Sequence, residues 1–324
     1  MTLTSKPTTQ AVGLNVIPRA AGAALQWRLL LLWSACLLVP TAVLALPVWQ
    51  MLGGALDHSV HATALARQLD AFTVADLSAV IGRNGAMLNT AGLLALLVTL
   101  LLSPLLSGFV LIAARVRLQT HGAACAGFGQ LMTGALAAYG RMLRLLLWSV
   151  VPLGIALAAG GQVMDFATRH NATALTETDA HLASRLALVV ALLLFGLAHA
   201  TVDAGRAMLA LEPQRTSAVK AWWRGLRLLV RRPLATLGSY LVLGLVGLAV
   251  AGALGVARIN LAPLGATMAV LGFLVTQLAA LVLAWMRSAR LFALIDVAAS
   301  RVERVAVPAT LSAQAGEESA VSLP

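Results

Sequence analysis

The stretch AGLLALLVTLLLSPLLSGFVLIAA, from Ala91 to Ala114, decides the fold class of this chain. It contains no charged residue from one end to the other. An α-helix needs about 20 predominantly apolar residues to cross the hydrocarbon core of a bilayer, which is roughly 30 Å thick. The stretch does not alternate between apolar and polar residues, as a strand of a transmembrane barrel does. It therefore predicts a membrane-spanning helix.

Five further stretches of the same kind occur along the chain. The sequence is 60% hydrophobic and only 11% charged, with a mean hydropathy of +0.89. A soluble domain is usually about 45–50% apolar and about 25% charged. We therefore expect an all-α polytopic membrane protein with six transmembrane helices. These are predicted at Trp27–Gln50, Ala91–Ala114, Met142–Met164, Leu186–Arg206, Leu234–Ala257 and Pro263–Trp285.

Basic residues are distributed unevenly among the segments that connect these spans. The chain has 23 Lys and Arg and 12 Asp and Glu, which gives a net charge of +11. Of the basic residues, 18 fall in the N-terminal and C-terminal segments and in the loops after the second and fourth spans. Positively charged loops stay on the cytoplasmic side of a membrane, so we expect both termini to be cytoplasmic. The composition, rich in Ala, Leu and Arg, is typical of a bacterial inner-membrane protein.

The segments outside the spans divide the chain into three parts. We expect a cytoplasmic N-terminal segment at residues 1–26 and a transmembrane domain at 27–304. Small polar residues around Pro308 predict a disordered tail at 305–324. The transmembrane domain is predicted to contain two long outer loops, 51–89 and 165–185, and two amphipathic inner helices, at about 126–141 and 215–232.

The second of these inner helices carries apolar residues, Trp222 among them, on one face and basic residues on the other. The basic residues are Lys220, Arg224, Arg227 and Arg231. A helix of this type lies in the membrane interface, where its cations contact anionic lipid headgroups. The alternative is a surface helix packed on the protein, and the two are compatible. No nucleic-acid-binding motif accompanies the charge, so we expect the lipid bilayer, and no nucleic acid, as a partner.

Matching segments suggest an internal repeat. A shift of 91 positions places Arg115 on Arg206 and Gly134 on Gly225, and a shift of 84 places GRAMLALE, from Gly205, on ARLFALID, from Ala289. The repeated unit would be a helical hairpin followed by an inner amphipathic helix, three times in parallel orientation. Convergence is the alternative, because helices that leave a membrane on this side commonly carry Arg.

Few polar residues interrupt the spans, and three of them are candidates for a substrate or proton pathway. His199 and Asp203 stand four residues apart, so they share one helix face. Ionisable residues inside a membrane commonly belong to ion or proton pathways. Asp203 lies near the end of its span, however, and a structural pair is the favoured interpretation. Gln277, in the middle of the sixth span, indicates an interhelical hydrogen bond or a substrate contact.

A second group of candidates follows the first span, in LDHSVH. Imidazole and carboxylate are ligands for zinc or copper, so Asp57, His58 and His61 are candidates for a metal site. The favoured alternative is that Asp57 caps a short helix and that both histidines are solvated loop residues. A metal site would require a further ligand from the second outer loop, because no HExxH or paired Cys/His motif is present.

Motifs of the common enzyme classes do not occur in this sequence. The chain has no Walker loop, no dinucleotide-binding fingerprint and no nucleophile elbow. We therefore expect no enzyme and no cofactor, but a scaffold or accessory subunit that works with other membrane proteins. Two alternatives stay open: a transporter or channel component that uses polar residues of the fourth and sixth spans, and a membrane enzyme or metal site on the outer loops.

Overall fold

The computed structural model describes residues 16–56, 78–172, 176–212, 214, 217–261 and 265–321, with only the helix path given for 301–321. All elements in this part of the chain are helices, and none is a strand. They are α1 (Val16–Ala23), α2 (Trp27–Leu56), α5 (Gly85–Gln119), α6 (Phe128–Asn171), α7 (Glu177–Leu211), α8 (Ala218–Arg231), α9 (Pro233–Asn260) and α10 (Gly265–Val321).

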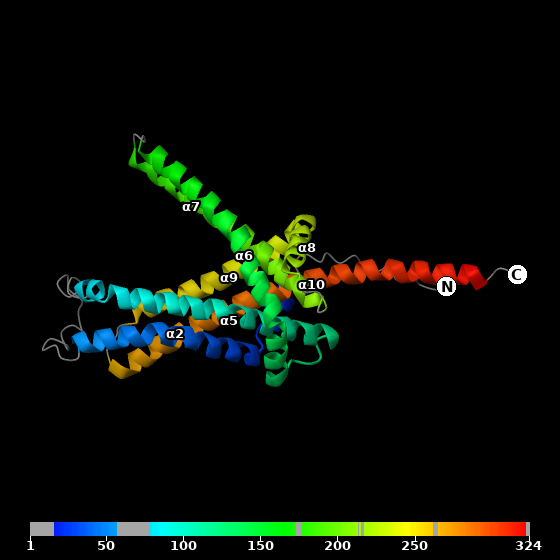
Figure 1. Cartoon of the computed structure of the whole chain (residues 1–324), viewed down its shortest axis with the longest axis horizontal. Coiled ribbons are helices and arrows are strands. Elements are labelled where there is room, and N and C mark those ends of the chain that lie inside the picture. Colours follow the sequence, from blue (N-terminus) through cyan, green and yellow to red (C-terminus); the bar gives the residue numbers. More distant parts are fainter. Residues whose placement is uncertain are drawn as a thin grey trace.

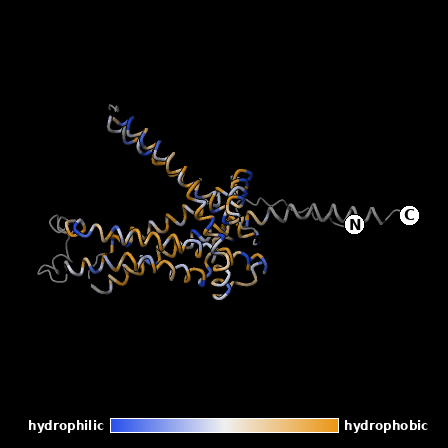
Figure 2. Tube along the Cα trace, in the orientation of Figure 1, coloured by the Kyte–Doolittle hydropathy of each residue, from blue (hydrophilic) through white to orange (hydrophobic). Residues whose placement is uncertain are grey.

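Six of these helices are long and apolar enough to cross a membrane. They are α2, α5, α6, α7, α9 and α10; the first five each contain one predicted apolar stretch, and α10 contains the sixth from Gly265 onward. Figure 2 shows apolar residues along the middle of these helices and polar residues concentrated towards their ends. The prediction of an all-α polytopic membrane protein with six spans is therefore confirmed.

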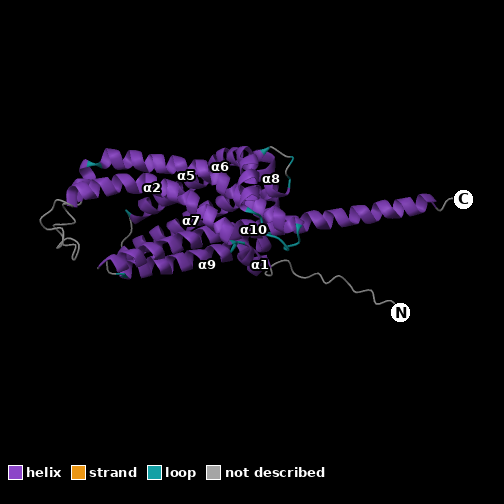
Figure 3. Cartoon of the chain, turned by 90° about the horizontal axis from the view of Figure 1, so that it is seen from below, coloured by secondary structure: helices purple, strands orange, loops and turns teal. Residues whose placement is uncertain are grey.

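Successive spans pair as hairpins, because α2 packs on α5, α6 on α7 and α9 on α10. Four spans, α2, α5, α9 and α10, run alongside one another, whereas the α6–α7 hairpin leans away from them (Figure 1). The short helices α1 and α8 lie at the end of the bundle from which α10 projects (Figures 1 and 3). We call this the arginine-rich end, because Arg115 of α5, Arg206 of α7 and Arg287 of α10 lie there, where the described helices meet.

The hydrophobic core is concentrated towards the arginine-rich end. Its fully buried side chains include Phe109 of α5, Leu145 of α6 and Phe292 of α10. Small residues allow the helices to approach one another here, which partly replaces the hydrophobic driving force that lipid removes. A Cβ atom at Gly108 would lie 3.0 Å from the Cα of Ala135, at the contact of α5 with α6.

Two segments that connect to the spans differ from their predicted form. The segment at 126–141 is the first part of α6 and not a separate inner helix. No proline stands between Phe128 and the start of the third predicted span, so the helix continues without a break. Helix α10 likewise continues to Val321, where composition predicts a disordered tail. This tail contains five Ala residues, and Ala has the highest helix propensity.

Helix α1 has no counterpart among the elements predicted from the sequence. It lies within the N-terminal segment, which lacks a stretch long enough for a span. Ala20 and Ala24 are fully buried against the bundle. The indole Nε1 of Trp285, in α10, donates a hydrogen bond to the carbonyl of Ala21 at 3.0 Å. Helix α1 is therefore anchored to the last span.

Candidate functional site

A buried polar group lies on the last turns of α7. Asp203 and Arg206 are only 3% and 7% exposed, although both are ionisable. NH1 of Arg206 donates a hydrogen bond to Oδ1 of Asp203 at 2.5 Å. His199, one turn earlier, places Nδ1 3.4 Å from Oδ2 of the same carboxylate. The helical spacing alone brings these three groups together, so the predicted proximity of His199 and Asp203 is confirmed.

Helices α9 and α10 complete this group. Nδ1 of His199 lies 2.7 Å from the hydroxyl oxygen of Tyr240, in α9. The guanidinium of Arg290, in α10, lies over the Tyr240 ring, with Cζ 4.6 Å from the ring centroid. One turn before it, Arg287 donates from NH2 to the hydroxyl of Ser103 in α5 at 3.3 Å. We call His199, Asp203, Arg206, Tyr240, Arg287 and Arg290 the polar cluster.

Three further arginines link helices around the polar cluster. Arg115, in α5, donates from Nε to the carbonyl of Ala210 at 2.6 Å and from NH2 to the carbonyl of Leu209 at 3.1 Å. Carbonyls in the last turn of a helix have no intrahelical partner, so Arg115 supplies one to the end of α7. The other two linking arginines form ion pairs with acidic residues of neighbouring segments.

The proposed repeat aligns Glu212 with Asp296, and each of these acidic residues forms an ion pair with one of the two arginines. Arg117, in α5, contacts Asp296 of α10, with NH1 3.1 Å from Oδ2. Arg224, in α8, contacts Glu212 at the end of α7. Equivalent positions of two predicted repeat units therefore perform the same structural task, which is to hold a helix end against another element. We call Arg115, Arg117 and Arg224 the arginine brace.

Helix α8 lies across the arginine-rich end (Figure 1). Ser217 caps its first turn, where its hydroxyl accepts a hydrogen bond from the backbone N–H of Lys220. The indole Nε1 of Trp222 donates to the hydroxyl of Thr201 in α7 at 3.0 Å. A Cβ atom at Gly225 would lie 2.5 Å from the backbone nitrogen of Gly205, so the two backbones are in contact. Helix α8 is thus fixed directly on α7.

The predicted headgroup contacts divide into two kinds. Lys220, Arg227 and Arg231 are exposed on α8. Arg224 is instead half-buried in its ion pair with Glu212. One of the four predicted contacts is therefore part of the arginine brace, and three present free surface charge.

The candidate pathway residues do not all meet. His199 and Asp203 belong to the polar cluster, but Gln277 lies ten residues before Arg287 on α10, about 15 Å along the helix axis. The candidate metal ligands Asp57, His58 and His61 lie outside the described residues. Within the described part of the chain, no group of three His, Cys, Asp or Glu side chains is placed to hold a metal ion.

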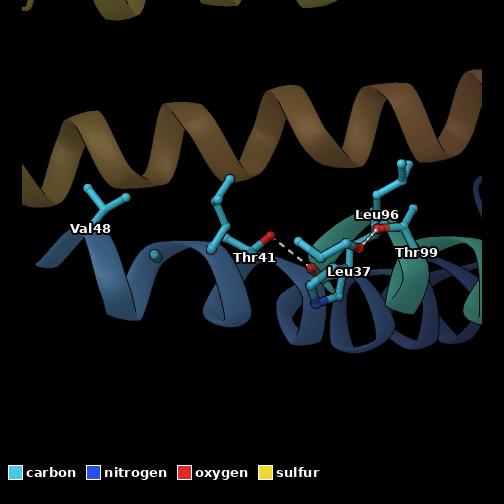
Figure 4. A pocket seen from close by; sticks show the side chains of 9 residues that line it. Leu37, Thr41, Val48, Leu96 and Thr99 are labelled. Carbon is cyan, nitrogen blue, oxygen red and sulfur yellow. Dashed lines mark hydrogen bonds between the residues drawn. The ribbon is translucent and has the colours of Figure 1, made fainter. Parts of the chain in front are cut away.

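Two pockets among the spans are apolar. Leu37, Thr41 and Val48 of α2 and Leu96 and Thr99 of α5 line the one in Figure 4. Its two threonines donate to backbone carbonyls one turn earlier, so their hydroxyls are satisfied within the helices. The second pocket, between the α6–α7 hairpin, α8 and α9, is lined by no ionisable side chain. Neither pocket provides a polar passage through the spans.

The sequence gives no direct signal for several members of the polar cluster and the arginine brace. In the sequence, Arg115, Arg287 and Arg290 contribute to the basic charge of the inner segments and nothing further distinguishes them. Tyr240 is unmarked within an apolar stretch, although it is one of only two tyrosines in the chain. Comparison with protein-family models, with curated proteins and with solved structures finds no match. Any function therefore rests on the geometry of the described residues.

Proposed function

We propose that this protein is a non-enzymatic scaffold or accessory subunit of a membrane protein complex, located in the bacterial inner membrane with both termini in the cytoplasm. One observation carries the proposal. At the arginine-rich end, Arg117 joins α5 to Asp296 of α10 and Arg115 joins α5 to the end of α7, while the α6–α7 hairpin leans away from the other spans. Such an arrangement stabilises a shape and leaves apolar surface for other helices.

The pairing of Asp203 supports a structural role for the polar cluster. One carboxylate oxygen accepts from Arg206 and the other faces His199. A buried charge that is fully paired in this way is costly to disturb, because removal of one partner leaves the other charge buried alone. Gln277, which a pathway through the fourth and sixth spans requires, is not part of the cluster.

Exposed apolar side chains on the hairpin support an interaction with other membrane proteins. Val150 and Ile155 of α6 are 67% and 66% exposed, and Leu193 of α7 is 61% exposed. Although α6 and α7 also contact α5, α8 and α10, these exposed side chains leave part of each span available to lipid or to a partner helix. The hairpin therefore offers apolar surface that a partner helix can cover without disturbing the core of the protein.

The side chains of α8 support the proposal that this helix lies at the cytoplasmic interface of the membrane. Trp223 and Val230 are exposed apolar residues on this helix, next to the exposed cations Lys220, Arg227 and Arg231. Exposed Trp and aliphatic residues beside Lys and Arg are typical of helices at the boundary between lipid acyl chains and headgroups. The side with most of the basic residues is cytoplasmic in inner-membrane proteins.

Site-specific photo-crosslinking in cells tests this function. A photoreactive amino acid at Val150 or Leu193 places the probe on the hairpin, and the same probe at Leu248 of α9, which is 58% exposed, serves as the control. We expect a discrete protein adduct from both hairpin positions and none from Leu248. Lipid adducts alone at all three positions would contradict the scaffold role.

The transporter alternative predicts a different result with purified protein. Proteoliposomes that contain a proton or ion pathway dissipate an imposed gradient, and Asp203→Asn would abolish that flux. We expect no flux above that of empty liposomes from the wild-type protein. A flux from the wild-type protein above that of empty liposomes would contradict the scaffold role and favour the transporter alternative.

A further inference from the structure

An apolar groove lies where the α6–α7 hairpin leans away from α9. Its volume is about 490 Å³. Ile155 of α6 and Leu197 of α7 line one side, and Leu226 and Val230 of α8 line the end, with Leu237 of α9 opposite. Ile155 and Val230 are 66% and 72% exposed, so the groove opens towards the surroundings of the helices. An occupant can enter it sideways from the lipid.

The polar atoms at the wall of the groove are already satisfied. The hydroxyl of Thr201 accepts a hydrogen bond from Nε1 of Trp222 and donates to the carbonyl of Ala198 at 2.7 Å. The other described side chains of its wall are apolar. A buried water needs two to four polar partners, and these walls offer none beyond that satisfied pair. The groove therefore suits a hydrocarbon chain better than water or a polar ligand.

Positive charge lies beside this apolar groove. Arg231 and Arg232 stand between Val230 and Pro233, both of which line it, and Arg227 lies one turn earlier on α8. Arg227 and Arg231 are exposed, and Arg232 is half-buried. In the part of the chain that the structure describes, no acidic side chain pairs with these three guanidinium groups, whereas Arg224 is paired with Glu212. The cations nearest the groove are thus the ones left for an external anion.

We propose that this groove is a specific site for an anionic phospholipid. One acyl chain lies between Leu197 and Leu237, and the phosphate lies against Arg227, Arg231 and Arg232. Guanidinium groups bind phosphate oxygens through paired N–H donors. Charge complementarity favours this occupant over an apolar helix of another copy, which would leave three cations without a counter-charge. The inference does not depend on the scaffold role.

Photoactivatable lipids test the acyl-chain part of the site. The full chain is reconstituted into nanodiscs with phosphatidylglycerol or phosphatidylcholine that carries a diazirine in one acyl chain, and adducts are mapped by mass spectrometry. We expect adducts at the groove residues of α6 and α7. Leu197→Trp fills the groove and should lower their yield several-fold. Leu192→Trp, on the opposite face of α7 and 60% exposed, should leave it unchanged.

Substitution of the arginines tests the proposed contact with the lipid headgroup. An arginine or lysine near an anionic lipid surface contributes about a fivefold preference per charge. Arg231→Gln with Arg232→Gln should therefore reduce the preference for phosphatidylglycerol over phosphatidylcholine by about this factor for each charge. Arg169→Gln removes an exposed charge near the last turn of α6, 14 residues beyond the groove residue Ile155, and should leave the preference at the groove intact.

Three results would overturn the proposal. The first is equal labelling of wild-type protein by both lipids. The second is an equal effect of Leu197→Trp and Leu192→Trp. The third is a disulfide between two copies that each carry Leu197→Cys, because a second copy would then cover the groove.

Discussion

Arg206 and Asp203 lie one turn apart on α7 and form a buried ion pair, in which NH1 and Oδ1 are 2.5 Å apart. The carboxylate also faces His199, whose ring contacts Tyr240 of the neighbouring span. A local pair of charges on α7 is thereby connected to the packing of α7 against α9. This connection makes the pair sensitive to substitution on either helix.

Removal of the charge at Asp203 should destabilise the fold strongly. Asp203→Asn leaves Arg206 buried without its counter-charge, and loss of one partner of a buried ion pair costs about 3–5 kcal/mol. We expect a clear decrease in the thermal unfolding midpoint in detergent, measured by intrinsic fluorescence. Asp165→Asn, at an exposed position of α6, should leave the midpoint unchanged.

Replacement of Asp203 and Arg206 together should destabilise the fold less than replacement of Asp203 alone. Asp203→Asn combined with Arg206→Met removes both charges, so the cost of an unpaired buried charge disappears. We expect the double variant to unfold at a higher temperature than Asp203→Asn alone. A lower midpoint in the double variant would show that Arg206 has a further partner in the cluster.

Arg115 should be required as arginine and not only as a cation. It reaches two successive carbonyls at the end of α7 through separate nitrogens, a geometry that the single ammonium group of lysine does not reproduce. Hydrogen bonds from charged donors contribute about 1.5–3 kcal/mol each. Arg115→Lys and Arg115→Gln should therefore both lower the unfolding midpoint. Arg144→Gln, at an exposed arginine of α6, should not.

The contact of α8 with α7 should depend on the absence of a side chain at Gly225. Its Cβ would lie 2.5 Å from Gly205 nitrogen and 2.6 Å from the carbonyl carbon of Ala204, and both are backbone atoms that cannot rotate away. Overpacking of this kind costs about 1–3 kcal/mol. Gly225→Ala should make the α7–α8 connection more sensitive to limited proteolysis. Gly129→Ala, where no atom lies within 4 Å of the added Cβ, should be neutral or stabilising.

The sequence predicts those parts of this structure that depend on local spacing. The six spans follow from the length of the apolar stretches. His199 and Asp203 meet because residues four apart share a helix face. In each case the interacting residues are close in sequence, so no knowledge of the packing is needed.

Contacts between residues far apart in the sequence could not be predicted from local spacing. Arg115 meets Ala210 across 95 positions, and Tyr240 meets His199 across 41. Such pairs depend on how each helix rotates and tilts against its neighbours, and an isolated hydropathy pattern contains no information about either. The same reason explains why the outward lean of the α6–α7 hairpin is visible only in the structure (Figure 1). The groove beside α9 follows from that lean.

The bond between His199 and Tyr240 separates the structural and the transport interpretations of the polar cluster. Tyr240→Phe removes one hydroxyl and keeps the ring that Arg290 covers, so the loss of the 2.7 Å contact is the main change. A single hydrogen bond contributes about 0.5–1.5 kcal/mol, and we expect a decrease in unfolding midpoint of corresponding size. Proton leak through proteoliposomes should equal that of the wild-type protein, because a hydrogen bond that only holds two helices together does not conduct protons.

Tyr139→Phe is the control for the loss of a hydroxyl as such. It removes the other tyrosine hydroxyl of the chain from its bond to the Leu101 carbonyl at 2.9 Å. A change in leak with Tyr240→Phe and not with Tyr139→Phe would assign His199 and Tyr240 to a proton pathway.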